Sequence, residues 1–254
     1  MIKGLYAAAS AMLAGITEQN ILSHNISNMD TPGFKQILTS LQDFLQTPVS
    51  APPATAAGIY GSRWVGEIGL GTDTTGEEID FTQGTLQLTS QPMDFAIEGN
   101  GFFRVQTPNG ERYTRDGRFY LDSEGQMVTV DGYFVLDEGG QPITLPENGD
   151  LSVNAEGRIF MNGEEVAQFG RAAFLDPAAE LTRQESNVFL ASGDPSSEDY
   201  GVIVQGYIEA SNSNAAQLNT QMVIVARHYE AAQQLVQNQD ALLGQAITAL
   251  GRIS

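Results

Sequence analysis

The stretch NILSHNISNMDTPGFKQ, residues Asn20 to Gln36, ends a helix abruptly and thereby divides the chain. Pro32 is not accommodated inside a helix and pushes the residue before it toward extended geometry. Gly33 permits the positive φ that a tight turn requires. We therefore expect a helix to end by about Met29 and a different kind of structure to begin after the turn.

The residues before this turn have helical periodicity. Positions in steps of three and four form an N-terminal stripe of Leu5, Ala8, Met12, Gly15, Gln19, Leu22, Ile26 and Met29. The opening MIKGLYAAASAMLAGI also has the composition of a secretory signal, which is the alternative reading. Cleavage would destroy the stripe, and polar residues from Thr17 to Asn20 interrupt the roughly 18 apolar residues that a membrane span needs. We expect the segment to be retained and not to enter a membrane.

The far end of the chain repeats this pattern. No proline occurs from Asn214 to Arg252, and a C-terminal stripe comprises Leu218, Met222, Val225, Tyr229, Ala232, Val236, Gln239, Leu243, Ala246 and Leu250. At 1.5 Å per residue this helix is about 58 Å long. The two ends either pair within one monomer, parallel or antiparallel, or pack between subunits. Unequal lengths favour packing between subunits, because Val236, Leu243 and Leu250 should extend beyond the first helix.

The middle of the chain has the two-residue alternation of β-strands. APPATAAGIYG, Ala51 to Gly61, reads as a linker, and the runs after it are broken by turn signals at Asn109-Gly110, Glu124-Gly125 and Asp131-Gly132. We expect an α+β chain. Its parts are an N-terminal helix in residues 1–36, an extended linker in 37–69, a mostly antiparallel β domain in 70–206, and a C-terminal helix in 207–254, with the helices pairing as a coiled-coil-like domain.

Charge and cysteine content exclude several functions. The chain has 12 basic and 31 acidic side chains, a net charge of -19, which is wrong for binding nucleic-acid phosphates. It has no cysteine, so it has neither disulfides nor thiolate metal sites. Residues 1–36 and 207–254 hold four basic and five acidic side chains, whereas residues 37–206 hold eight and 26. The helices are therefore near neutral, and the β region is acidic.

Catalytic motifs are absent from the sequence. The only histidines are His24 and His228, and no HExxH, GxSxG or GxxxxGK[ST] occurs. GEIGLGTDTTG, Gly66 to Gly76, resembles a phosphate loop but lacks the lysine that would follow it. We expect no catalytic residue, metal or cofactor. One alternative stays open, a secreted acidic β-rich enzyme acting on glycans, with helical oligomerisation termini, because carboxylates are abundant.

The two ends together resemble the flagellar basal-body rod and hook protein family of bacteria. The family's opening signature is matched by Asn25, Asn28, Thr31, Pro32, Gly33, Phe34 and Lys35. The segments FTQGTLQLTSQPMDFAIEGNGFFRV, YTRDGRFYLDSEGQMVTVDGYFVL and QGYIEASNSNAAQLNTQMVIVARHYE are also similar to it. Ser27 stands where the family often has alanine, and Ser213 where it commonly has valine.

The resemblance implies a structural subunit of the basal-body rod, of the proximal or distal type, since a single β domain favours rod over hook. It implies export through the flagellar export apparatus without a cleaved signal, and assembly with itself and other rod and hook proteins into the axial drive shaft. The residues expected to carry self-assembly are Leu5, Met12, Leu22, Asn25, Ile26, Asn28, Met29, Thr31, Pro32, Gly33, Phe34, Leu218, Met222, Val225, Tyr229, Val236, Leu243 and Leu250.

Overall fold

The chain has an α+β fold that divides into two compact units. The computed structural model describes residues 2–51, 63–146, 149–184, 187–195 and 200–251. Unit 1 comprises Met1–Ile26, Ile37–Glu78 and Ala215–Ser254, and unit 2 comprises Ser27–Gln36 and Ile79–Asn214. The turn at Pro32 therefore belongs to the β-rich unit, although the sequence had placed it with the helices.

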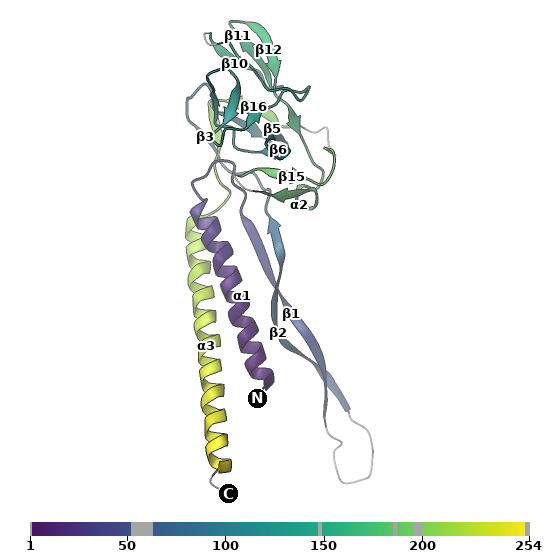
Figure 1. Ribbon diagram of the computed structural model, residues 1–254, viewed down its shortest axis with the longest axis vertical. Coiled ribbons are helices and arrows are strands. Elements are labelled where there is room, and N and C mark those ends of the chain that lie inside the picture. The colour runs from purple at the N-terminus through teal and green to yellow at the C-terminus, as the bar shows by residue number, and fades with distance from the viewer. Residues whose placement is uncertain (1, 52–62, 147–148, 185–186, 196–199, 252–254) are drawn as a thin grey trace. The chain divides into compact units, whose positions relative to one another are not determined.

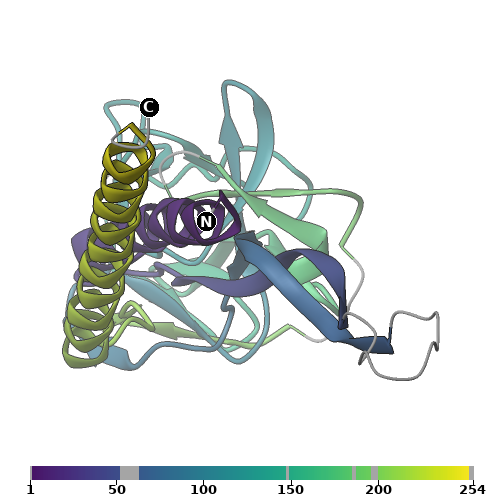
Figure 2. The same cartoon turned by 90° about the horizontal axis from the view of Figure 1, so that it is seen from below.

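Unit 1 contains the two long helices and a two-stranded sheet. Its elements are α1 (Ile2–Ser27), β1 (Ile37–Ala51), β2 (Arg63–Ile79) and α3 (Ala215–Gly251); the last residues of α1 and of β2 belong to unit 2. Residues 37–69, expected to be an extended linker, contain β1 and the start of β2, and residues 52–61 of the expected Ala51–Gly61 linker lie outside the described residues. Figures 1 and 2 both show α1 lying beside α3.

Unit 2 is built almost entirely of short antiparallel strands. They are β3 (Leu86–Leu88), β4 (Phe95–Glu98), β5 (Phe102–Thr107), β6 (Gly110–Thr114), β7 (Phe119–Leu121), β8 (Met127–Thr129), β9 (Phe134–Val135), β10 (Leu151–Val153), β11 (Arg158–Met161), β12 (Glu164–Gln168), β13 (Arg171–Ala172), β14 (Leu181–Arg183), β15 (Phe189–Ala191), β16 (Val202–Gln205) and β17 (Tyr207–Glu209). One short helix, α2 (Pro177–Glu180), precedes β14 and is capped by Asp176.

The sheets of unit 2 are arranged around a central set of strands. The largest sheet has the order β14-β15-β6-β5-β9-β8-β7, with β13 also pairing with β5. A three-stranded sheet has the order β10-β11-β12, and two pairs, β16-β4 and β17-β3, join segments far apart in the sequence. The strand β17 was expected to be part of the C-terminal helix, but α3 begins only at Ala215.

The predicted turns of the β region are confirmed, and its strands enclose an apolar core. Gly110, Gly125 and Gly132 have φ values of 104°, 77° and 83° at the ends of the β5-β6, β7-β8 and β8-β9 connections. Consecutive residues such as Phe102 and Phe103 belong to two different apolar clusters, and rings pack edge to face, such as Phe95 with Phe169 at 5.0 Å between centroids. This core gives unit 2 its own source of stability.

Candidate assembly site

The C-terminal stripe is the least exposed face of α3. Every described side chain of the stripe, from Leu218 to Ala246, is buried or half-buried. Among the α3 residues between Leu218 and Ala246 that do not belong to the stripe, only Ala226 is not exposed. The backbone of Leu250 is helical, but its side chain lies outside the described part. Apolar burial at this spacing is typical of a helix that packs against other helices along its length.

The N-terminal stripe is covered less evenly. Its members Ala8, Gly15 and Leu22 are buried, and Met12, Ile26 and Met29 are half-buried, whereas Leu5 and Gln19 are exposed. Leu22 packs with Leu218 and Val225 in a small apolar cluster that Ile26 and Met222 extend. The contact of α1 with α3 is therefore formed by the two predicted stripes.

The two helices of one chain run antiparallel. Leu22 contacts the start of α3, Gly15 lies against Tyr229, and Gly4 lies against Gln239. The expectation that Val236 lies beyond the first helix is wrong, because α1 reaches as far as Gln239. Only the part of α3 after Gln239, which includes Leu243, runs past the first turn of α1, since α1 begins at Ile2.

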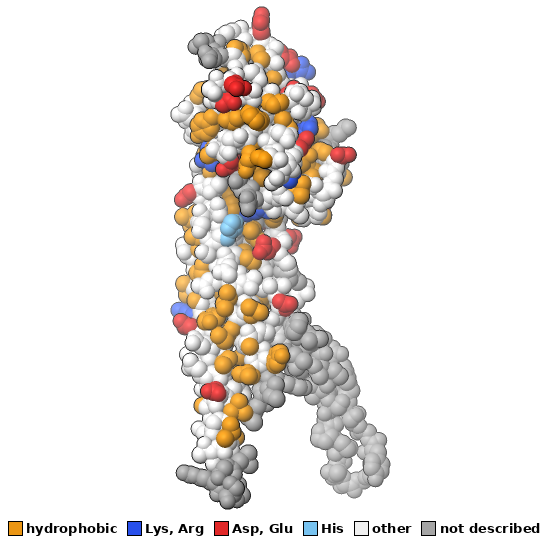
Figure 3. Space-filling model, in the orientation of Figure 1, with side chains coloured by type: hydrophobic (Ala, Val, Ile, Leu, Met, Phe, Trp, Pro, Cys, Tyr) orange, Lys and Arg blue, Asp and Glu red, His pale blue; other side chains and the backbone are white. Residues whose placement is uncertain are grey.

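Each helix also carries a second apolar stripe, which we call the outer stripe. On α1 it consists of Tyr6, Ala9, Leu13 and Ile16, and on α3 of Ile224, Ala231, Leu235, Leu242 and Ala249, with the polar His228, Asn238 and Gln245 at positions between them. All are exposed, with Tyr6 67% and Leu13 65% accessible. Each outer stripe is offset by one residue from the inner one, which rotates it by about 100° around the helix. Figure 3 shows hydrophobic side chains along the helices.

Asn25 holds the chain that follows the turn against the end of α1. Its side chain is buried, its Nδ2 donates to the carbonyl of Ile37 at 2.7 Å, and its Oδ1 accepts from the Ile37 N–H at 2.9 Å. An amide side chain satisfies both backbone groups of an extended residue in this way. The first asparagine of the opening motif therefore positions the start of β1.

The rest of the motif is a tight turn inside unit 2. The N–H of Thr31 donates to the carbonyl of Asn28, and that of Phe34 donates to Thr31. Gly33 has a φ of 68°, and a Cβ there would lie 2.5 Å from the backbone of Arg115, so only glycine fits. The carbonyl of Pro32, which is buried, accepts from Asn187 at 3.1 Å.

Lys35, in the segment that follows α1, and Glu209, in β17, form a buried ion pair within unit 2. Each is 1% exposed, and Lys35 Nζ lies 2.6 Å from Glu209 Oε1. Arg115 lies 3.1 Å from the other carboxylate oxygen, and the Gly84 N–H donates to Oε1 at 2.9 Å. Burial lowers the pKa of Lys35 and of Arg115, and the charge of Glu209 partly offsets this. Removing Glu209 would leave two uncompensated buried cations.

The segments on either side of this pair are tied together. The Gly33 N–H donates to the Glu209 carbonyl at 2.7 Å, and the Gln36 N–H donates to Asn212 Oδ1 at 2.8 Å. The guanidinium carbon of Arg183 lies over the Phe34 ring, 4.2 Å from the ring centroid. Sequence reasoning found the N-terminal half of this network but missed its partners, which carry no local signal.

The described residues offer little for catalysis. No group of three or more His, Asp or Glu side chains suited to a metal ion occurs among them, and His24 and His228 are both exposed on helices. No helix in the described part of the chain is long and apolar enough to cross a membrane. The site consists of apolar helix faces and a buried structural network.

Family models match the same three regions. The flagella basal body rod protein model matches residues 5–35, the flagellar hook protein FlgE/F/G D1 domain matches residues 96–161, and the flagellar basal body rod FlgEFG protein C-terminal model matches residues 204–249. The first contains the N-terminal stripe, and the third contains Glu209 and the C-terminal stripe as far as Ala246. The second covers much of the core of unit 2.

Curated relatives match over nearly the whole chain. The flagellar basal-body rod protein FlgG of Borreliella burgdorferi is 35% identical over 96% of this chain and 97% of its own length. The FlgF protein of Rhizobium meliloti is 35% identical over 99% of both chains, and FlgG of Bacillus subtilis is 31% identical over 97% and 98%.

The chain belongs to the flagellar basal-body rod protein family. It is a structural subunit of the rod and not an enzyme, so the glycan-hydrolase alternative is dropped. Membership places it at the basal body of the bacterial flagellum, in assembly with other axial proteins. Because the family function is structural, the stripes and the buried network are the features that need a functional account.

Proposed function

We propose that this rod subunit assembles with copies of itself through its terminal helices, which pair in a coiled-coil-like manner across subunits. The inner stripes hold α1 and α3 of one chain together, and the outer stripes pack against neighbouring subunits. Leu243 and Leu250, at the end of α3, pack against a neighbouring chain as well. The assembled helices form the axial shaft, and the motif from Asn25 to Phe34 positions each chain within it.

The outer stripes are the observation that carries this proposal. A soluble monomer gains nothing from leaving Tyr6, Leu13, Leu235 and Leu242 in water, since exposed apolar faces of this length promote association. A helix with two apolar stripes can also pack against more than one other helix, as a filament built of helices requires. The low charge of the helices, compared with the acidic unit 2, favours close packing between copies.

Torque transmission requires that the chain resist distortion where it enters and leaves unit 2. The buried network of Lys35, Glu209 and Arg115 supports this role, because it links the segment after α1 and the segment before α3 to the same β core. Breaking a buried ion network costs several kcal/mol, so this network resists distortion better than exposed ion pairs would.

We further propose that the subunit leaves the cytoplasm through the flagellar export apparatus with its N-terminus intact. The inner stripe of α1 includes Leu5 and Ala8, which lie in the segment that resembles a secretory signal. Cleavage there would remove the part of α1 that reaches Tyr229 and Gln239 on α3. Mass spectrometry of rod-incorporated protein tests this, and a product lacking about 15 N-terminal residues would sink the idea.

The assembly proposal is tested by placing a charge on an outer stripe. Leu235→Asp puts a carboxylate where a neighbouring helix is expected, whereas the matched control Gln237→Asp puts the same charge on the same helix outside both stripes. In a strain lacking the wild-type gene, the first variant should abolish rod incorporation and swimming, and the control should retain both. Normal rods containing Leu235→Asp would refute the role of the outer stripe.

A further inference from the structure

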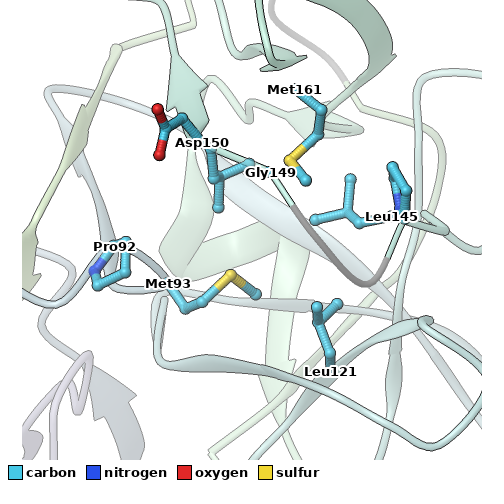
Figure 4. Close-up of a pocket in the computed structure, with 9 residues that line it drawn as sticks. Pro92, Met93, Leu121, Leu145, Gly149, Asp150 and Met161 are labelled. Carbon is cyan, nitrogen blue, oxygen red and sulfur yellow. The ribbon is translucent and has the colours of Figure 1, made fainter.

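Unit 2 has an apolar groove that the helix-driven assembly does not use. Its volume is about 490 Å³, within the range of ligand-binding pockets. We call the lining side chains of Met93, Leu145 and Met161 its floor; Leu121, Leu151 and Asp150 line it as well. Figure 4 shows the side chains of Met93, Leu121, Leu145 and Met161 around one space, with the Asp150 carboxylate turned outward.

One side of the groove is an open strand edge. The segment from Met93 to Phe95 pairs with the outer edge of β7, because Phe119 N–H donates to the Met93 carbonyl at 3.2 Å. Pro92 has no N–H, and the pairing stops there. Leu121 is the next residue of β7 whose backbone N–H and carbonyl point away from β8.

The backbone of Leu121 has no partner in the described part of the chain. Leu121 lies opposite Met127 on β8, and the Met127 N–H points away from it, donating to Ile143 at 2.8 Å. The pair is therefore a non-hydrogen-bonded one, and the N–H and carbonyl of Leu121 face the groove. An exposed edge of this kind is a template for another strand.

The other side of the groove is also a strand edge. The carbonyl of Leu151 on β10 accepts from Gln205 at 3.1 Å, and the Val153 N–H donates to the same side chain at 3.2 Å. The N–H of Leu151 points to the same side as its carbonyl and has no partner among the described residues. Two donors and one acceptor of the backbone therefore border one apolar floor.

The charge of unit 2 indicates which peptides would bind in such a groove. Unit 2 contains eight basic and 23 acidic side chains. Each basic side chain has a hydrogen-bond or ring partner within the unit; they are Lys35, Arg104, Arg112, Arg115, Arg118, Arg158, Arg171 and Arg183. Unit 2 is thus acidic as a whole, and Asp150 is the charged residue among those that line the groove, so the field of the unit attracts a cationic partner and repels a second acidic unit 2.

We propose that this groove binds an extended segment of another protein, in which an apolar side chain is flanked by lysine or arginine. The segment lies between β7 and β10 and pairs with the backbone of Leu121 and Leu151, while its apolar side chain fills the space above Met93, Leu145 and Met161. The site lies wholly in unit 2 and is separate from the helix stripes, so it adds a docking function to the assembly function.

The test uses the full-length protein labelled with ¹⁵N and a blocked seven-residue peptide in which lysine alternates with leucine. We expect saturable shifts of the Leu121 and Leu151 amide signals. Methylating alternate backbone nitrogens of the peptide should weaken binding about tenfold or more, because the backbone pairing is lost while the side chains stay. A peptide with glutamate in place of lysine should bind more weakly, and salt should reduce the difference.

A protein variant provides the second arm. Leu121→Asn should weaken the lysine–leucine peptide about tenfold or more, whereas Leu175→Asn, at a leucine that is 78% exposed outside the groove and next to α2, should leave binding unchanged. If the methylated peptide bound as tightly as the unmethylated one, the groove would be a nonspecific apolar patch and the proposal would be wrong. No shift at millimolar peptide, or concentration-dependent broadening of the same amides without peptide, would overturn the proposal, the latter in favour of self-association.

Discussion

The two units bury their side chains to different degrees. The largest fully buried side chains among the described residues, from Phe95 and Phe103 to Lys35 and Glu209, all belong to unit 2. Unit 1 buries mainly small or medium side chains along its inner stripes, and it exposes large apolar ones such as Tyr6 and Leu13. Unit 2 is therefore expected to be stable alone, whereas unit 1 depends on neighbouring subunits for much of its stability.

The largest effect on unit 2 is expected from Glu209→Ala. This change leaves Lys35 and Arg115 as buried cations without their shared anion, which should lower the free energy of unfolding of unit 2 by about 3–5 kcal/mol. Amide exchange at Val105, in the core of unit 2, measures this free energy. The exposed Glu98→Ala is the control and should change it by less than about 0.5 kcal/mol. Equal losses in both variants would show that the network does not stabilise unit 2.

A smaller loss is expected from Gly33→Ala. The new Cβ would meet the backbone of Arg115, and alanine disfavours a φ of 68°, so we expect unit 2 to lose about 1–3 kcal/mol. Gly132→Ala is a matched control, since its φ of 83° is similar but nothing lies within 4 Å of the added atom. Urea unfolding of both variants separates backbone strain from collision. If Gly132→Ala lost as much free energy of unfolding as Gly33→Ala, the loss at Gly33 would not come from collision with Arg115.

A pH effect of under about 1 kcal/mol is expected from Glu111, because both it and its partner Arg104 are partly exposed. The hydrogen bond from Arg104 holds the pKa of Glu111 below its ordinary value of 4.5. The resulting stability is present above pH 4.5 and is lost as the pH falls through the lowered pKa. Glu111→Gln should therefore reduce the urea midpoint at pH 7 more than at pH 3. The reverse order would contradict the assignment.

The smallest effect on unit 2 is expected from Leu243→Asp. Leu243 lies on α3 beyond Gln239, so amide exchange at Val105 should be unchanged within about 0.5 kcal/mol, whereas rod incorporation should be lost. Immunoblots of whole cells and of purified basal bodies would distinguish loss of assembly from loss of protein. Global unfolding of the purified variant would mean that this part of α3 stabilises the monomer.

Local repeats explain what the sequence could predict. The stripe on α3 was readable because burial repeats every three or four residues, and the hairpin turns were readable because glycine sits where φ is positive. The ion pair of Lys35 with Glu209 was not readable, since 174 residues separate the partners and 31 acidic side chains compete for the role.

The unit boundaries were missed for a related reason. The sequence changes from helical to β periodicity near Met29, but periodicity does not reveal that the turn after it folds into the β unit. That placement depends on contacts such as Gly33 with Glu209 and Asn212 with Gln36, which form only between distant segments. The segment from Tyr207 to Glu209 likewise becomes a strand because it pairs with β3.

Three of the four points at which the chain passes between the units meet at one set of hydrogen bonds. Gln36 accepts at its carbonyl from the Asp80 N–H at 3.0 Å, and Asn212 donates to the Asp80 carbonyl at 2.8 Å. The points at which the chain enters and leaves unit 2 therefore lie close together. An inserted domain of this kind tolerates replacement, because the rest of the chain contacts it mainly at those points. A foreign domain inserted between Asp80 and Asn212 would then be carried by the same two helices.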